Sequence, residues 1–176
     1  MKKYTLLFLF CCLYSLTNTA QINDPQYIDK VQTLDGTLET LYGVISGEAG
    51  QERDWDLFRY LFYPNAKLIP SGKNKEGAYA ARFMTPDDYI NGSGKWLVEN
   101  GFFEKEISRE VNTFGNITQV FSTYESFKSE ADATPFMRGI NSIQLLNDGK
   151  RWWIITIYWT QETEENPIPA AYLPKN

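Results

Sequence analysis

The chain has 176 residues, of which 43% are hydrophobic, 22% charged and 15% aromatic, the composition of one folded soluble domain rather than of a disordered or fibrous chain. It contains no His, two Cys and a formal net charge of −5, so most chemistry that depends on His or Cys is excluded. Nucleic acid is also an unexpected partner, because backbone phosphates bind clustered Lys and Arg.

The first twenty residues have the three-part layout of a secretory signal peptide. Two lysines precede an apolar run at residues 6–13, and a more polar stretch ends at the small residue Ala20. We expect cleavage after Ala20 and a periplasmic or secreted protein with no stable membrane insertion, because the run is less than half of the roughly 20 residues that span a bilayer. Lipid attachment at Cys11 or Cys12 is the alternative, although neither cysteine follows a small residue.

Cleavage at this point divides the chain into a signal peptide at 1–20, a folded domain at 21–163 and a Pro-containing tail at 164–176. The mature chain then has no Cys, so its stability must come from the hydrophobic core.

Three helices are predicted in the first half of the mature chain. Apolar residues at steps of three and four indicate a helix over 27–46. Asp54 can cap a short second helix that ends before Pro64. Thr85, followed by a proline and two acids, predicts a third helix over 85–100.

Strands follow the helices. Short strands are expected at 66–69 and 78–83, and beyond Gly101 the hydrophobic period changes to alternation. This alternation predicts four long strands joined by hairpins, beginning at residues 103, 117, 136 and 151. Helices first and antiparallel strands afterwards indicate an α+β fold, in which a curved sheet packs on helices gathered at one face. Such an arrangement leaves a pocket between the layers.

Two segments connect this pattern with a known family. Residues 54–66 run from a helix into a strand, and residues 148–154 run from a hairpin turn into an aromatic strand. With the order of the other elements, they resemble the nuclear-transport-factor-2-like superfamily, the cone-shaped fold shared by ketosteroid isomerases and SnoaL-like polyketide cyclases. The resemblance covers about residues 27–162 and implies a homodimer.

The resemblance also implies places for catalytic groups, which this chain fills differently. Pro70 stands where the isomerases carry a proton-abstracting Asp, and Thr156 and Tyr158 lie on the last strand where many relatives carry His. Tyr42 is the counterpart of the isomerase Tyr donor. A Tyr hydroxyl without a nearby base can orient an oxygen but cannot remove a proton from carbon at neutral pH.

Several carboxylates are candidate acid–base groups. Glu104 and Glu106 share one face of a strand, and we expect that face to be solvated because polar residues alternate there. Glu125 lies in a central strand between aromatic residues, where a buried carboxylate needs a partner, and Arg138 is the expected partner. Glu125 and Tyr42 are therefore the weak catalytic candidates, with Tyr60 as another donor.

Polar and aromatic side chains on the predicted elements are expected to line the pocket. The predicted ligand-binding residues are Tyr42, Trp55, Tyr60, Tyr124, Arg138, Ser142, Gln144 and Trp153. One bulge in the third long strand would exchange Arg138, Ser142 and Gln144 on the pocket face for Met137, Asn141 and Ile143. Aromatic walls would suit an apolar or sugar-like ligand.

These observations favour an exported small-molecule-binding domain with a partly apolar ligand. The alternative is a cofactor-independent isomerase, dehydratase or hydrolase that uses a buried carboxylate and a Tyr. A structural or protein-interaction module is the second alternative. No cofactor and no metal are expected, because the mature chain lacks His and Cys and because the acid pairs at 54/56 and 87/88 are typical of helix starts.

Overall fold

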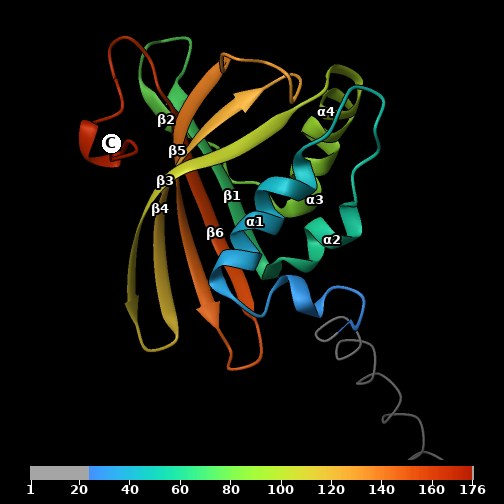
Figure 1. Ribbon diagram of the computed structural model, residues 1–176. Coiled ribbons are helices and arrows are strands. Elements are labelled where there is room, and N and C mark those ends of the chain that lie inside the picture. Colours follow the sequence, from blue (N-terminus) through green and yellow to red (C-terminus); the bar gives the residue numbers. More distant parts are fainter. Residues whose placement is uncertain (1–23, 176) are drawn as a thin grey trace, which may run out of the picture.

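The computed structural model describes residues 24–175, which form a curved sheet with helices against one face and the C-terminal tail against the other (Figure 1). The predicted signal peptide at 1–20 lies outside the described residues. No helix within 24–175 has the length and apolarity needed to cross a membrane.

The sheet has six strands in the order β2-β1-β6-β5-β4-β3. Their bounds are β1 Phe62–Lys73, β2 Tyr79–Ala81, β3 Phe103–Phe114, β4 Ile117–Phe127, β5 Met137–Asn147 and β6 Trp152–Gln161. β1 runs parallel to β6, and all other pairs are antiparallel. The predicted α+β class and the four long strands are confirmed, and β1 is three times as long as the segment expected at 66–69 because Phe62 and residues 67–71 pair with β6 and residues 71–73 pair with β2.

Three register irregularities bend the sheet around the helices, and one of them lies between Phe62 and Lys67 in the β1–β6 pair. The β3–β4 register shifts between Glu106 and Ser108, and the β5–β6 register shifts between Gln144 and Leu145. A bulge of this kind increases the local twist and bends the strand. The inner, helix-facing side of β5 carries its odd-numbered residues, and burial alternates along the strand accordingly.

The predicted helix at 27–46 consists of two pieces. A short 3₁₀ turn, η1 Ile28–Lys30, precedes α1 Leu34–Ile45. The Thr33 side chain ends the turn and starts the helix, because its hydroxyl oxygen accepts a hydrogen bond of 3.0 Å from the Gly36 amide. Gly36 thus lies in the first turn, where an added Cβ would come within 3.2 Å of the Lys30 carbonyl oxygen.

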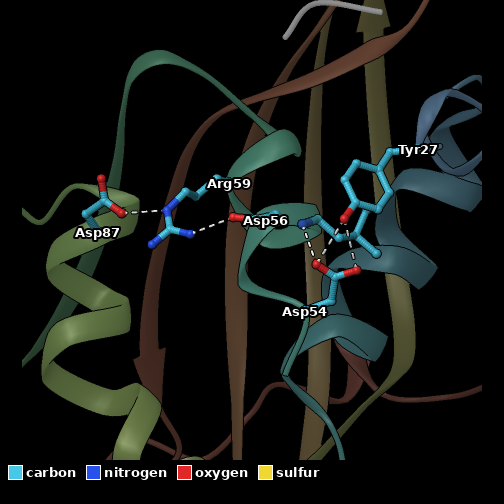
Figure 2. Close-up of polar contacts among 6 residues, drawn as sticks. Tyr27, Asp54, Asp56, Arg59 and Asp87 are labelled. Carbon is cyan, nitrogen blue, oxygen red and sulfur yellow. Dashed lines mark hydrogen bonds and ion pairs between the residues drawn. The ribbon is translucent and has the colours of Figure 1, made fainter. Parts of the chain in front are cut away.

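The second helix, α2 Trp55–Tyr60, is fixed by carboxylates at its start (Figure 2). Asp54 accepts a hydrogen bond of 2.8 Å from the Leu57 amide and is also contacted by the Tyr27 hydroxyl. The Arg59 side chain of α2 lies 3.0 Å from Asp56 in the same helix and 2.7 Å from Asp87 at the start of the next helical segment. Asp54 therefore caps the helix start, as expected from the sequence, and Asp56 and Asp87 also form surface ion pairs.

The predicted helix at 85–100 has a different geometry in its middle. It consists of α3 Pro86–Tyr89, a π-helical turn η2 Ile90–Gly94 and α4 Lys95–Asn100. A capping box between Thr85 and Asp88 starts it. Gly92 and Gly94 lie in the π turn, and such turns occur often at functional sites because they re-aim side chains. The helix ends at Gly101, whose φ of 70° favours glycine.

A buried arginine holds the far end of the sheet to α2. Arg151 is 1% exposed, and its guanidinium lies 3.9 Å from the Tyr60 ring centre and 3.6 Å from the Trp153 ring centre. It also donates a hydrogen bond to the Tyr60 carbonyl oxygen. A buried charge needs compensating contacts, and the Tyr60 and Trp153 rings supply them to this cation.

The C-terminal tail packs on the outer face of the sheet. Its 3₁₀ turn, η3 Ala170–Tyr172, places the Tyr172 carbonyl oxygen 2.7 Å from the Thr123 hydroxyl and the Tyr172 ring edge-on to Phe121. The Ile168 amide donates to Glu162 at 2.9 Å. The tail therefore covers part of the face opposite the helices (Figure 1).

Candidate functional site

A cavity of about 230 Å³ lies between the helical layer and the inner face of the sheet. Most of its wall is apolar, and a few polar groups converge on it, as in small-molecule sites generally. It is lined by Leu41, Ile45, Phe58, Leu68, Tyr89, Ser93, Trp96, Leu97, Phe102, Glu104, Tyr124, Met137, Asn141, Ile157, Trp159 and Gln161. The cavity is smaller than the roughly 300 to 1,000 Å³ of drug-sized sites, so it suits a small ligand.

Glu104 is the acidic residue of this wall. It lies near the start of β3, opposite Ser126 of β4, with its side chain toward the helices. Asn141 Nδ2 donates to its Oε1 at 3.3 Å, and the Ser126 hydroxyl donates to its Oε2 at 3.4 Å. Both bonds are long, and burial raises the pKa of the carboxyl group to about 7. At neutral pH the group is therefore present in both protonation states.

A chain of hydrogen bonds runs from Asn141 behind the cavity to the protein surface. Asn141 Nδ2 also donates to the Tyr42 hydroxyl at 3.2 Å, and the Tyr42 and Ser122 hydroxyls are 2.6 Å apart. Ser122 in turn donates to Glu106. Burial, strengthened by the negative charge of Glu104, raises the pKa of Tyr42, so its hydroxyl stays neutral.

An ion-pair relay ends this chain. Arg109 lies 2.7 Å from Glu106 and 2.7 Å from Asp35, which is mostly exposed at the start of α1. Glu106 therefore has a cationic partner, whereas Glu104 has neutral ones. Two glutamates on one strand face thus have different environments.

Two further tyrosines, Tyr89 and Tyr124, belong to the cavity wall. Burial raises the pKa of each, and the charge of Glu104 raises both further, so both phenols lie within electrostatic reach of that carboxylate. Tyr124 lies over Gly139, where an added Cβ would be 2.5 Å from the Tyr124 hydroxyl oxygen. Neutral phenols beside a carboxyl group can donate hydrogen bonds to a ligand oxygen.

The remaining wall is largely aromatic. Phe58 stacks on Tyr89 with ring centres 5.4 Å apart, and Trp96 meets Phe102 edge-on. Trp96 keeps 44% of its surface exposed, and Trp159 is half-buried. The π turn positions this wall, because it lies between Tyr89 and Trp96.

A larger hollow of about 310 Å³ lies on the opposite face, between the sheet and the tail. Its carboxylate, Glu162, is already paired with Arg138 at 2.7 Å. The Ile168 amide and Arg138 lower the pKa of Glu162. Because Glu162 has a cationic partner and Glu104 has only neutral ones, the inner cavity is the stronger candidate site.

The structure brings few of the predicted ligand-binding residues together. Tyr124 lines the inner cavity and Tyr42 supports it from behind. Trp55 packs edge-on against Phe58, and Ser142 lines the outer hollow.

The other predicted residues lie elsewhere. Tyr60 and Trp153 enclose Arg151, and Gln144 is exposed. Arg138 pairs with Glu162, and it lies 3.9 Å from Glu125, the partner expected from the sequence. Glu125 is therefore ion-paired away from the cavity.

Sequence reasoning placed Glu104 and Glu106 on the wrong side of the sheet. The alternation along β3 was predicted, but the two acids face the helices rather than solvent, because α1 and α4 cover that side. On β5 the residues Met137, Asn141 and Ile143 face inward. The sequence predicted this set only for a strand that contains a bulge. Tyr89, Ser93 and Trp96 were missed, although their spacing of four and three marks one helical face.

A carboxyl group whose pKa lies near neutrality can both accept and donate a proton. Beside it, neutral phenols can hold an oxygen atom, and aromatic walls can bury a ring or a methyl group. No group of three metal-binding side chains occurs within residues 24–175.

Comparisons with known proteins identify the fold. No protein-family model and no curated protein matches the sequence. Among solved structures, the beta subunit of a candidate aromatic-ring-hydroxylating dioxygenase from Novosphingobium aromaticivorans matches with a TM-score of 0.56 and 11% identity, over 77% of this chain and 94% of that one. A candidate ketosteroid isomerase from Parabacteroides distasonis matches with a TM-score of 0.52 and 9% identity, over 77% and 98%.

An NTF-2-like protein of unknown function from Silicibacter pomeroyi also matches, with a TM-score of 0.51 and 16% identity, over 78% of this chain and 98% of that one. At such low identity the likeness concerns the backbone and not the activity. The strand order, the curved sheet and these neighbours agree with the resemblance seen in the sequence: the chain has the cone-shaped fold of the nuclear-transport-factor-2-like superfamily.

Proposed function

We propose that the protein binds a small, partly apolar molecule in the inner cavity. The observation that supports this most directly is the placement of Glu104, a carboxyl group without a charged partner, in a wall made mostly of aromatic and aliphatic side chains. Core packing alone does not account for such a group, since burying it costs free energy. A ligand with one polar group and an apolar body would meet both parts of the wall.

A fragment screen tests the proposal. Trp96 and Trp159 line the cavity, so a bound fragment changes tryptophan fluorescence, and ligand-observed NMR measures the same binding independently. Trp96→Leu should weaken binding, and because Trp96 is 44% exposed the variant should still fold. Phe83→Leu, at a side chain 69% exposed between β2 and α3, is the matched control. If no fragment binds, or if both variants bind equally well, the proposal is wrong.

Proton-transfer catalysis is the second candidate function. It is favoured by the pKa of about 7 at Glu104 beside the Tyr89 and Tyr124 phenols. Glu104 would remove a proton from carbon next to a carbonyl group, and a phenol would hydrogen-bond the oxygen on which negative charge develops. One structural neighbour is described as a candidate ketosteroid isomerase.

Hydrogen–deuterium exchange into cyclic ketones, followed by NMR, tests this activity without a known substrate. The wild-type chain should exchange the protons next to the carbonyl faster than Glu104→Gln, because an amide cannot accept the proton. Glu110→Gln, at an exposed glutamate of the same strand, should exchange as fast as the wild type. Equal rates for all three chains would eliminate this candidate.

Homodimer formation is also part of the proposal. Phe114 and Ile117 are exposed at 84% and 59% near the β3–β4 hairpin, and Tyr158 is 47% exposed on the outer face. Apolar groups of this size on a sheet face favour contact with a second copy. Multi-angle light scattering would measure a mass of two chains if this is right, and of one chain if the protein functions as a monomer or as a partner for another protein.

Export completes the proposal. Its support is the layout of residues 1–20, which predicts cleavage after Ala20. N-terminal sequencing of protein recovered from outside the cytoplasm should begin at Gln21. An N-terminus at Cys11 or Cys12 with an attached lipid would support the lipoprotein alternative instead.

A further inference from the structure

The described titratable groups close to Glu104 are neutral or negatively charged. The titratable groups near its carboxylate are Tyr42 from α1, Tyr89 from α3, Tyr124 from β4, and Glu106 two residues along β3. None of these groups carries a positive charge. Within residues 24–175 the groups that act on the Glu104 carboxyl are neutral donors, and the described lining of the cavity includes no Lys or Arg.

Two other glutamates, Glu106 and Glu162, have an arginine as their partner. Arg109 compensates Glu106 at 2.7 Å, and Arg138 compensates Glu162 at the same distance. Of these three glutamates, Glu104 alone lines the inner cavity, and it alone has neutral partners without a cationic one. The cationic partner is thus missing at the place where a ligand would bind.

Aromatic rings surround that place. The lining includes Trp96, Trp159, Tyr89, Tyr124 and Phe102. The face of an aromatic ring attracts a cation, Trp most strongly, and the attraction grows when water is excluded. A carboxylate together with several such rings is the arrangement that binds organic ammonium groups, while it repels anions.

We propose that the cavity takes a small organic cation, an amine or a quaternary ammonium compound, with its charge beside the Glu104 carboxylate and its carbon groups against the aromatic wall. This inference rests on the proposed binding function and names the ligand class. The chain as a whole favours it, because a net charge of −5 raises the local concentration of cations at the protein surface.

Benzylammonium and benzyl alcohol are suitable probes, since they share a ring and a size and differ in charge, and benzoate supplies the opposite charge. Titration calorimetry in a buffer without amines would compare them at about pH 8, where the pKa of about 7 leaves Glu104 mostly ionised. We expect benzylammonium to bind at least about tenfold more tightly than the alcohol, a difference of roughly 1.4 kcal/mol, and benzoate not to bind.

Proton release on binding is an independent test of the proposal. At pH 7 Glu104 is about half protonated. A cation favours the ionised form, so its binding should release up to about half a proton, measured from the heats in two buffers of different ionisation enthalpy. A ligand that accepts a hydrogen bond from the protonated acid would instead take up a proton. Uptake would overturn the cation inference.

Variants locate the effect. Glu104→Gln should lose the preference for the cation and the proton release, whereas Glu110→Gln should keep both. Loss of the preference in both variants, or its retention in Glu104→Gln, would overturn the inference. Circular dichroism checks that each variant is folded, and the wild-type proton release decides the question if Glu104→Gln does not fold.

The failure of this inference is distinguishable from failure of the binding function. If benzyl alcohol binds as well as benzylammonium, or if none of the three probes binds, the cation inference is wrong. The separate fragment screen with Trp96→Leu then decides whether the cavity binds neutral molecules.

Discussion

Asn141 Nδ2 lies 3.3 Å from Glu104 Oε1, and so joins β5 to β3 across β4. The same amide group reaches the Tyr42 hydroxyl at 3.2 Å. One side chain, 6% exposed, therefore holds both the cavity carboxylate and the phenol behind it. Substitutions at this pair test how the site is built.

The free energy of unfolding should depend on pH through Glu104. Burial raises its pKa from 4.5 to about 7, so the folded chain holds this proton more tightly than the unfolded chain. The stabilising contribution is complete below about pH 4.5 and is lost as pH rises through about 7, with a total change on the order of 3 kcal/mol.

Denaturant unfolding at several pH values measures this contribution as the difference between wild type and Glu104→Gln. The difference should favour the glutamine chain increasingly from about pH 4.5 to pH 8, whereas Glu110→Gln should follow the wild type. A constant difference across this range would show that Glu104 ionises normally.

Asn141→Ala should raise the pKa of Glu104 further. The amide donates to the carboxylate and so favours its ionised form, which its removal takes away. The same substitution leaves the buried Tyr42 hydroxyl with one partner fewer and should cost about 1 to 3 kcal/mol of stability. Carbon-detected NMR titration of labelled glutamates measures the first effect, and thermal unfolding measures the second.

Asn112→Ala is the control for this substitution, since Asn112 is exposed on β3. It should change neither quantity. An unchanged Glu104 titration in Asn141→Ala would mean that the long hydrogen bond does not influence the carboxyl group.

Gly139→Ala should destabilise the protein by about 1 to 3 kcal/mol. Its Cβ would lie 2.5 Å from the Tyr124 hydroxyl oxygen and 2.5 Å from the Thr160 carbonyl oxygen, and the latter belongs to the backbone and cannot easily move. Gly43→Ala is the matched comparison in α1, where nothing lies within 4 Å of the added Cβ. It should stabilise the chain by up to about 1 kcal/mol, because Ala is the better helix former. Chemical denaturation that ranks the two variants in the opposite order would contradict this packing.

Arg151→Lys should cost about 2 to 4 kcal/mol, although it preserves the charge. A lysine cannot stack its head between two rings, and its ammonium would be buried where Tyr60 and Trp153 now contact the planar guanidinium. Lys150→Arg at the exposed neighbouring position should be neutral. Thermal unfolding distinguishes this from a simple requirement for positive charge, which would leave Arg151→Lys as stable as the wild type.

The sequence predicted most of the fold because the fold is encoded in periodic patterns. Alternation beyond Gly101 placed the long strands, and the Thr85 cap placed the third helix at its start. The length of β1 was underestimated, since its pairing with β6 depends on residues far away in the chain. Local patterns contain no information on such distant partners.

The site was harder to predict for a related reason. Alternation on β3 shows that Glu104 and Glu106 share a face, but which face the helices cover is a tertiary property. Charged residues point outward in most strands, so the rule misplaced the one acid that the cavity uses. On β5 the adjacent residues Asn141 and Ser142 point to opposite faces of the sheet. Asn141 therefore lines the inner cavity, and Ser142 lines the outer hollow.

The parallel pairing of β1 with β6 also affects how the protein reaches its native state. Leu68 pairs with Ile157, 89 positions later (157 − 68), so this side of β1 stays unpaired until the ribosome has made β6. Contacts of such long sequence separation slow folding and leave an unpaired strand exposed in the meantime. A nascent chain that stalls before the β5–β6 hairpin would therefore expose β1 as an unpaired strand to which chaperones can bind. The pocket could not yet exist.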